Sequence, residues 1–406
     1  MVIIVGLIEI KLNIISFTAL AVALLLIGNY TLKHVNFFQK YSIPSPVVGG
    51  FGFAIIAWIG HQFGLFHFVM DNTLYDLTMY MFFVTIGLSS SLTLIKKGGK
   101  LLIYYILLCW ALAVMQNGTG IVLSFMTGID PLIGLMASQP GLQGGHGMAA
   151  SMAPVVEAAG IDSALTVGIA SATYGLIAGS LIGGPLSTFI INKNKVKLES
   201  DNFEYKVRHH EEIEKNGINS TGVAKALFLI FLSLAIGFPI ADWITDSTSF
   251  AMPGHIFSLF VGIVIRSLLE QQSMFIIPTK EINLVSTVSL EVFLVMAMMN
   301  LKIWELYELA LPLVIILIVQ TILIVLFVYF VLFRVLGKNY DAAVMSGGFI
   351  GHGLGATPNG LMIINAVTKH YGVNSQKAFL FIPIAGTVLT DIFGVPLFLF
   401  LVNLFS

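Results

Sequence analysis

Long apolar stretches recur along this chain, each about 20 residues long and separated by shorter polar segments. They lie near 13–32, 46–66, 77–95, 101–126 and 164–191, and then near 223–243, 253–271, 283–301, 309–333 and 378–404. A helix rises about 1.5 Å per residue, so about 20 apolar residues cross the roughly 30 Å of hydrocarbon in a bilayer. The pattern therefore predicts an all-α polytopic membrane protein with about 10 transmembrane helices.

One long polar segment, residues 192–222, divides these stretches into two sets of five. It mixes basic and acidic side chains, which is typical of a solvated linker. We therefore divide the chain into an N-terminal repeat (1–191), this linker and a C-terminal repeat (223–406). Because each repeat has an odd number of helices, the two repeats cross the membrane in opposite senses.

Residues of the same type recur between the halves at a nearly constant offset. The matching pairs are 204 to 207 residues apart: Pro46 and Pro253, Gly179 and Gly386, His146 and His352, Gln116 and Gln320. Internal repeats of opposite orientation are a common architecture of secondary transporters. We therefore expect two inverted five-helix repeats.

Charge sets the orientation and excludes some partners. The chain is 57% hydrophobic and 10% charged, against about 25% charged in soluble domains. Placing the central linker in the cytoplasm puts 18 of the 20 Lys and Arg residues there, as the positive-inside rule requires. Both termini are then outside. The net charge of −1 offers no basic surface for nucleic acid, and the single cysteine predicts neither a disulfide nor a metal site.

Two glycine-rich segments interrupt the helical pattern. GLQGGHGMAAS spans 141–151 and SGGFIGHGLGATPNG spans 346–360. Glycine is unfavourable inside helices, and non-helical backbone is tolerated in a membrane only where protein or water surrounds it. We predict re-entrant loops near 131–156 and 340–366, which dip in from opposite faces. Broken helices of this kind mark the binding site of many transporters.

These segments carry a family resemblance that covers nearly the whole chain. The residues are YSIPSPVVGG at 41–50, GGHG at 144–147, ALPLVIILIVQT at 310–321, GKNYDAAV at 337–344 and GLGATPNG at 353–360. Together they resemble the sodium/glutamate symporter family. The resemblance implies ten spans, two re-entrant loops, a homodimer and sodium-driven uptake of L-glutamate at the bacterial inner membrane. It also implies alternating access by an elevator-like movement of a transport core against a dimerisation scaffold.

The site must bind two carboxylates and an ammonium group. The three arginines, Arg208, Arg266 and Arg334, all fall in the cytoplasm or at the membrane edge. We therefore expect backbone N–H groups at helix ends, assisted by hydroxyl and amide side chains, to bind the carboxylates. The candidate substrate ligands are Gln143, Gly144, Gly145, Gly147, Ser346, Gly353, Thr357, Asn359, Gln116 and Gln320. For Gln116 and Gln320, interhelical hydrogen bonding is an equally good explanation.

Sodium, the only metal ion expected, needs oxygen ligands, and no organic cofactor is expected. Unwound backbone and nearby polar groups are the candidates: Gly145, His146, Gly351, Gly355, Thr357, Asn359 and Asp391. Asp391 lies in the middle of an apolar span, where an acidic residue is a functional hypothesis by default. Glu291 is a second acid within a span and a candidate proton or ion site. His146 and His352 are better explained by loop packing than by catalysis, and we expect no enzyme activity.

Three departures from the family pattern bear on substrate and coupling ion: Met148, His352 and Glu291. They leave open a sodium- or proton-coupled transporter of another small amino acid or dicarboxylate. A gated channel and an intramembrane enzyme are the alternatives from other functional classes. Concentrative uptake under a sodium gradient separates a symporter from both.

Overall fold

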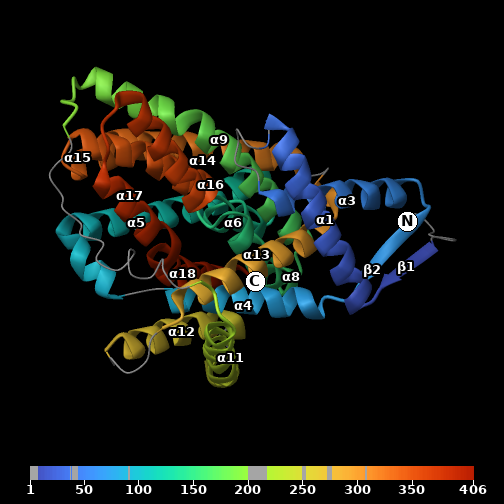
Figure 1. The fold of residues 1–406 in the computed structure, drawn as a ribbon. Helices are drawn as coiled ribbons and strands as arrows, with labels where there is room; N and C mark the ends of the chain where they lie inside the picture. The colour runs from blue at the N-terminus through green and yellow to red at the C-terminus, as the bar shows by residue number, and fades with distance from the viewer. Residues whose placement is uncertain are drawn as a thin grey trace.

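The computed structural model describes residues 8–36, 38, 44–89, 92–199, 217–248, 253–271, 277–306 and 309–406, and within them the chain is almost entirely helical (Figure 1). The N-terminal half contains α1 (Ile14–His34), α3 (Ser45–Gln62), α4 (Thr73–Ser89), α5 (Leu92–Thr127), α6 (Pro131–Met136), α7 (Gln139–Leu142), α8 (Gly145–Ala158) and α9 (Ala164–Lys193). The C-terminal half contains α11 (Ser220–Thr248), α12 (Gly254–Gln271), α13 (Thr279–Met299), η1 (Ile303–Leu306), α14 (Ala310–Phe327), η2 (Val328–Leu332), α15 (Phe333–Val335), α16 (Tyr340–Tyr371), α17 (Gln376–Ile384), η3 (Ala385–Leu389) and α18 (Thr390–Phe405). Most of the linker predicted at 192–222 lies outside the described residues.

A small sheet departs from the all-α expectation. Strand β1 (Ile8–Leu12) pairs in parallel with β2 (Phe66–Met70). The apolar run that we assigned to a helix over 46–66 therefore ends as a helix at Gln62. Gly64 then adopts a φ of +64°, which turns the chain into β2.

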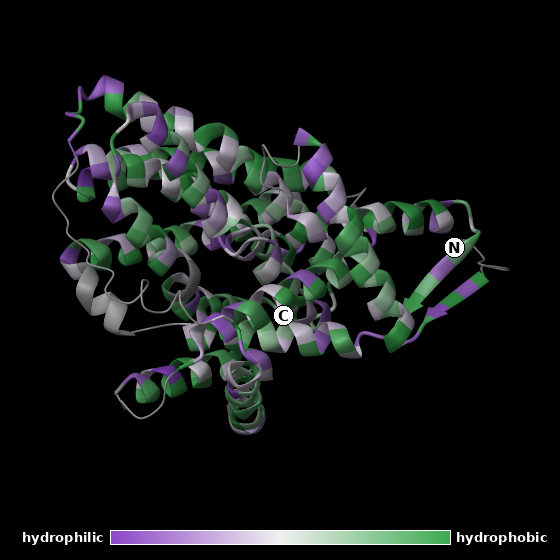
Figure 2. Ribbon diagram, in the orientation of Figure 1, coloured by the Kyte–Doolittle hydropathy of each residue, from purple (hydrophilic) through white to green (hydrophobic). Residues whose placement is uncertain are grey.

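Six of the predicted spans coincide with helices long and apolar enough to cross a membrane. Among the described residues these are Ile14–His34, Gly99–Thr127, Ala164–Lys193, Ser220–Ser247, Thr279–Met299 and Ala310–Val335. The other four predicted spans correspond to α3, α4, α12 and the segment from α17 to α18, which are short, less apolar or interrupted. Figure 2 shows apolar residues predominating along the helices, with many polar residues at their ends and in the connections.

The span predicted over 378–404 is not one regular helix. It is interrupted by η3, a π-helical turn, whose wider winding changes the backbone pairing. Side chains take up the displaced carbonyls: Thr390 Oγ1 donates to Ala385 O at 2.7 Å, and the Trp110 indole donates to Leu389 O at 2.7 Å. Thus α5 supports the irregular turn from the N-terminal half of the chain.

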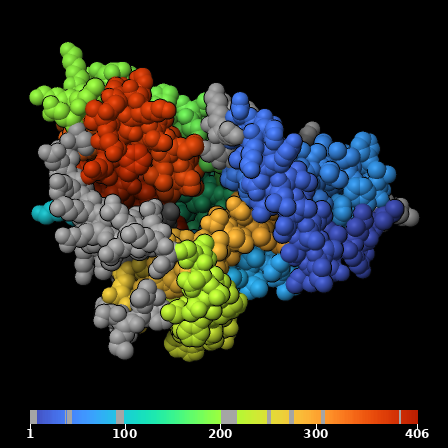
Figure 3. Space-filling model, viewed as in Figure 1, coloured from blue at the N-terminus to red at the C-terminus, as the bar shows by residue number. Residues whose placement is uncertain are grey.

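The helices pack into two clusters. The scaffold cluster consists of α1, α3, α4, α11, α12 and α13, whereas the core cluster consists of α5 to α9 and α14 to α18. Each half of the chain contributes its first three long helices to the scaffold cluster and the rest to the core cluster. The clusters touch where α13 meets α8 and where the Tyr75 hydroxyl donates to Ala150 O at 3.2 Å. In the space-filling view, the blue N-terminal helices lie to one side of the red C-terminal helices (Figure 3).

Candidate functional site

The first glycine-rich segment is not a loop but a series of short helices, α6, α7 and α8. Ser138 lies outside helical geometry between α6 and α7, and Gly145 has a φ of +65° where α8 begins. We call residues 137–145 the first break. Gly144 provides no side-chain cap for α8. The first N–H groups of α8 therefore have no partner within the helix and point out of its N-terminal end.

The second glycine-rich segment is also mainly helical. Helix α16 is interrupted only at Gly355 and Ala356, the second break, where φ and ψ are −137° and 29° and then 64° and 169°. An alanine in this region is strained by about 1–3 kcal/mol. The break places the free carbonyls that end at Leu354 beside the free N–H groups that begin at Thr357. Loops were expected at both segments because glycine disfavours helix, but here several glycines instead permit close helix packing.

The two breaks meet, although Gly145 and Ala356 are far apart in the sequence. A methyl group added at Gly145 would lie 2.8 Å from Cβ of Ala356. Carbon atoms ordinarily approach to about 3.5–4.0 Å. Gly145 is therefore in contact with the Ala356 methyl group at this point, which we call the junction. It brings the N-terminus of α8 close to the second break, where another helix segment begins.

Two glutamines on α5 and α14 link each half to the break of the other half. Gln116 donates its amide N–H to Gly353 O, next to the second break, at 2.9 Å. Gln320 donates to Ser138 Oγ in the first break at 3.0 Å and to Gln116 O at 2.8 Å. Both glutamines are fully buried. The interhelical hydrogen bonding considered from the sequence is thus present, and it converges on the breaks.

Helix α9 packs against the second break. A Cβ at Gly175 would overlap the carbonyl oxygen of Leu354, so α9 and α16 approach to backbone contact there. Beside Gly175, Asn359 donates to Leu176 O at 3.2 Å, and one turn further along α9 it accepts from the Ser180 hydroxyl at 2.8 Å. Asn359 therefore ties the second segment of α16 to α9, using both ends of its amide group.

The two histidines occupy different environments. His146 Nε2 lies 3.0 Å from Thr173 Oγ1, and that hydroxyl donates its proton to Ile169 O. The histidine is therefore the donor, and its Nδ1 keeps a lone pair. His352 is completely buried, and neither of its ring nitrogens has a partner among the described residues. Its ring packs against Gly386, where a Cβ would lie 2.9 Å from Nδ1.

No described arginine reaches the junction. Arg266 pairs with Glu270 at 2.8 Å, and Arg334 donates to carbonyl oxygens one turn back in its own helix segment. Arg208 lies outside the described residues. The positive potential at the junction therefore comes from the two helix N-termini, each equivalent to about half an elementary charge. Such ends bind anions through their free N–H groups.

Asp391 on α18 is buried, with 9% of its surface exposed. Among the residues that the structure describes, its carboxylate has no hydrogen-bond or ion-pair partner. Gly394, three residues later and on the same side of α18, packs against the Gln139 amide of the first break. A buried carboxylate without a partner is costly, so a bound cation is the natural complement.

Two predicted residues lie outside the breaks, although α13, which carries one of them, packs against α8 through Leu290. Ser346 is nine residues before Gly355, about 13 Å along the helix, and its hydroxyl donates to Ala342 O at 2.7 Å. Glu291 lies on α13 in the scaffold cluster and is partly exposed.

The remaining predicted residues lie at or near the breaks. Gly144 and Gly147 flank the start of α8, and Gly351 is one turn before the second break. Gln143 is buried, with its amide nitrogen 3.5 Å from Cys109 O.

Several polar residues of the site were not among those predicted from the sequence. They are Asn117, Ser138, Gln139, Thr173 and Ser180. The adjacent amides Gln116 and Asn117, inside an apolar span, were a usable signal. The hydroxyl residues were not, because serine and threonine are common in membrane helices, where they bond to their own backbone.

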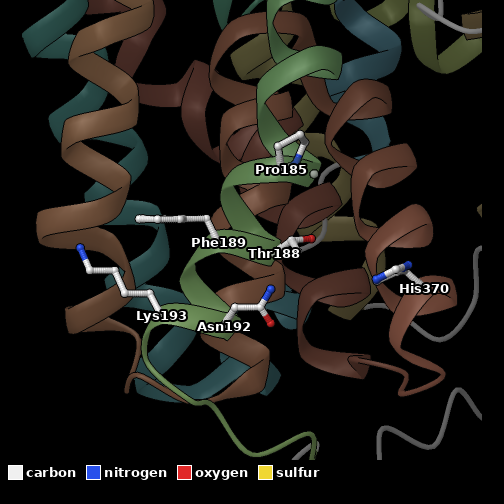
Figure 4. Close-up of a pocket in the computed structure, with 7 residues that line it drawn as sticks. Pro185, Thr188, Phe189, Asn192, Lys193 and His370 are labelled. Carbon is white, nitrogen blue, oxygen red and sulfur yellow. The ribbon is translucent and has the colours of Figure 1, made fainter.

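A surface groove of about 850 Å³ lies at the C-terminal ends of α9 and α16. Gly184, Pro185, Thr188 and Asn192 line one wall, and His370 faces them (Figure 4). The groove is separate from the junction. It nevertheless begins one helical turn from Ser180, which binds Asn359.

Known proteins resemble this chain in sequence over nearly its whole length. The sequence model of the sodium/glutamate symporter family matches residues 10–373. A sodium/glutamate symporter of Haemophilus influenzae is 35% identical over 383 residues, which cover 93% of this chain and 94% of the relative. One from Escherichia coli is 35% identical over 370 residues, covering 91% and 92%. The chain therefore belongs to the sodium/glutamate symporter family.

Proposed function

We propose that this chain is a secondary active transporter that takes up L-glutamate together with sodium. The observation that carries the proposal is the junction of two broken helices in a chain of this family. Both relatives described above are named sodium/glutamate symporters. Symport is a transport activity, and the proposal includes no enzyme reaction.

The carboxylates of glutamate bind at the two helix N-termini. The free N–H groups that follow Gly145 and Ala356 supply donors, and the helix dipoles supply positive potential. Thr357 adds a hydroxyl, because its side chain has no hydrogen-bond partner among the described residues. None of the arginines in the described part of the chain reaches the junction, which supports this assignment, since backbone groups must then meet the negative charge.

Sodium binds to oxygen atoms on the carbonyl side of the same breaks. Free carbonyls near Gly351 and Gly355 are suitable ligands, and the Asp391 carboxylate supplies the negative charge. Asn359 already uses both ends of its amide in holding α9. We therefore assign it a positioning role.

The equal division of each half between the two clusters supports two inverted repeats, with the breaks as re-entrant elements. We propose that the core cluster moves against the scaffold cluster during transport, and that two copies associate as a homodimer. The central linker is cytoplasmic, both termini are outside, and the protein resides in the bacterial inner membrane. In this orientation the groove beside Thr188 and His370 opens toward the cytoplasm and forms the approach to the second break.

Uptake into proteoliposomes tests the function. We expect concentrative accumulation of radiolabelled L-glutamate under an inward sodium gradient. Flux that only equilibrates glutamate and ignores sodium would instead identify a channel. Competition by aspartate, other small amino acids and hydroxy-dicarboxylates identifies the substrate. Stronger competition by any of these than by glutamate would overturn the assignment.

The Asp391→Asn substitution tests the ion site. Removing the buried charge should weaken sodium-dependent uptake at least tenfold, because the bound cation loses its anionic partner. Glu291→Gln tests the second acid within a span, which lies outside the core cluster. If Asp391→Asn keeps normal sodium dependence, Asp391 is not a sodium ligand. If Glu291→Gln abolishes a pH dependence of uptake, protons take part in coupling.

A further inference from the structure

Five buried carboxamide side chains surround the first break and the crossing of α5 with α14. Each of them is at most 2% exposed and has one polar atom without a hydrogen-bond partner among the described residues. These atoms are Gln116 Oε1, Asn117 Nδ2, Gln139 Nε2, Gln143 Oε1 and Gln320 Oε1. Buried polar atoms are almost always paired, so such a concentration indicates that something else bonds to them.

The neighbours of Gln116 and Gln320 determine which end of each side-chain amide is free. The Nε2 of Gln116 lies 2.9 Å from Gly353 O, and the Nε2 of Gln320 lies 2.8 Å from Gln116 O. A backbone carbonyl accepts hydrogen bonds and never donates them, so the nitrogen of each amide must face it. The oxygen of each side chain therefore points away from these bonds and is left free.

Free oxygens have the wrong polarity for a carboxylate. From the sequence we expected Gln116 and Gln320 to donate hydrogen bonds to glutamate. Their amide N–H groups, however, already donate to other groups of the protein. A neutral amide oxygen instead repels an anion and attracts a cation. Sodium in transporters is commonly held by carbonyl-type oxygens where helices are broken.

We infer that Gln116 Oε1 and Gln320 Oε1 are ligands of a sodium ion at the crossing of α5 with α14, beside the first break. This inference rests on the proposed function and adds a cation site to the one assigned to Asp391. The two glutamines lie in the same neighbourhood, because the Gln320 amide bonds directly to the Gln116 backbone and to Ser138. Because these ligands are neutral, the ion keeps its full positive charge to offset the net negative charge of bound glutamate.

A sodium ion at this place would also link the two breaks. Gln116 holds the second break through Gly353, and Gln320 holds the first through Ser138. An ion bound to both amide oxygens would fix both side chains at once. Sodium binding would thus order the two helix ends that receive the substrate carboxylates.

Binding of radioactive sodium to the purified full-length protein, without glutamate, tests the inference. Gln116→Leu and Gln320→Leu remove the oxygens, and we expect each variant to bind one sodium ion fewer than the unmodified protein, or to bind it at least tenfold more weakly. Asn403→Leu is the matched control, because Asn403 is an amide on α18 that donates to its own helix and has no unpartnered buried oxygen. It should bind sodium normally.

A second measurement tests the inference if the leucine variants fail to fold. Gln320→Asn keeps the amide but withdraws its oxygen by one methylene, so it should change the preference for sodium over lithium at least threefold. A purely structural role for Gln320 would leave that preference unchanged. Normal sodium binding by both leucine variants, or unchanged ion preference in Gln320→Asn, overturns the inference. The proposed function fails separately, if the unmodified protein shows no sodium-driven glutamate uptake.

Discussion

A single methyl group at the junction provides the sharpest test of the fold. In Gly145→Ala, the new side chain must adopt a φ of +65°, which costs an L-residue about 1–2 kcal/mol. Its Cβ would also lie 2.8 Å from Cβ of Ala356, and such overpacking costs about 1–3 kcal/mol. We therefore expect a loss of about 2–5 kcal/mol in the free energy of unfolding, together with loss of uptake.

A double-mutant cycle separates the two costs. Ala356→Gly removes the methyl group that the new side chain meets, so Gly145→Ala should cost only about 1–2 kcal/mol in that background. The coupling energy between the two positions should then be about 1–3 kcal/mol. Gly128→Ala is the control for conformation alone, because its φ is +73° and no atom lies within 4 Å of a Cβ there.

Reversible unfolding in mixed detergent micelles measures these free energies, and proteoliposome uptake measures function for each variant. We expect non-additive effects on the free energy of unfolding at Gly145 and Ala356, and additive effects at Gly128 and Ala356. Strict additivity at the first pair would refute the conclusion that the two breaks touch.

Three further predictions concern the surroundings of the junction. Gly175→Ala should lower stability by about 1–3 kcal/mol, because its Cβ overlaps the Leu354 carbonyl. Gly184→Ala, on the same helix with open space around it, should raise stability by up to about 1 kcal/mol. Thermal unfolding compares the two variants. Thr357→Val removes a hydroxyl but keeps the shape, so the glutamate concentration for half-maximal uptake should rise about tenfold, which corresponds to about 1.4 kcal/mol; an unchanged value removes Thr357 from the site. Gly184→Trp should fill the groove and slow uptake severalfold while sodium binding stays normal. Normal uptake would exclude the groove as the path to the second break.

The sequence predicted the class of protein and its family better than it predicted the local geometry. The apolar runs correctly indicated membrane helices, because the length and apolar composition of a segment by themselves favour hydrocarbon over water around it. The glycine-rich segments mark the candidate site, but helix was expected to give way to loop there, and both segments are mainly helical. Gly347 and Gly353 show the reason. A position without a side chain also admits a neighbouring backbone, as Gly347 does, or a neighbouring side chain, as Gly353 does, and local propensity does not distinguish loop formation from close packing.

Roles of individual polar residues were harder to predict. Ser346 and Asn359 are equally plausible ligands in the sequence, yet one hydroxyl bonds to its own helix and the other side chain holds α9. Gln116 and Gln320 were recognised as candidates, but an amide has a donor end and an acceptor end. Which end is free depends on neighbours more than 180 residues away in sequence, such as Ser138 for Gln320.

The sequence by itself determined that this chain is a multi-pass membrane protein and that a glycine-rich segment lies in each half of its length. These properties follow from composition and periodicity within short segments, where side-chain transfer free energies and backbone propensities act locally. Only the tertiary structure decided that the interruptions meet at Gly145 and Ala356, and that two glutamines turn their oxygens away from the protein's own carbonyls. Those features depend on how helices from opposite halves pack, because hydrogen bonds and steric contacts between distant residues exist only once the helices are assembled.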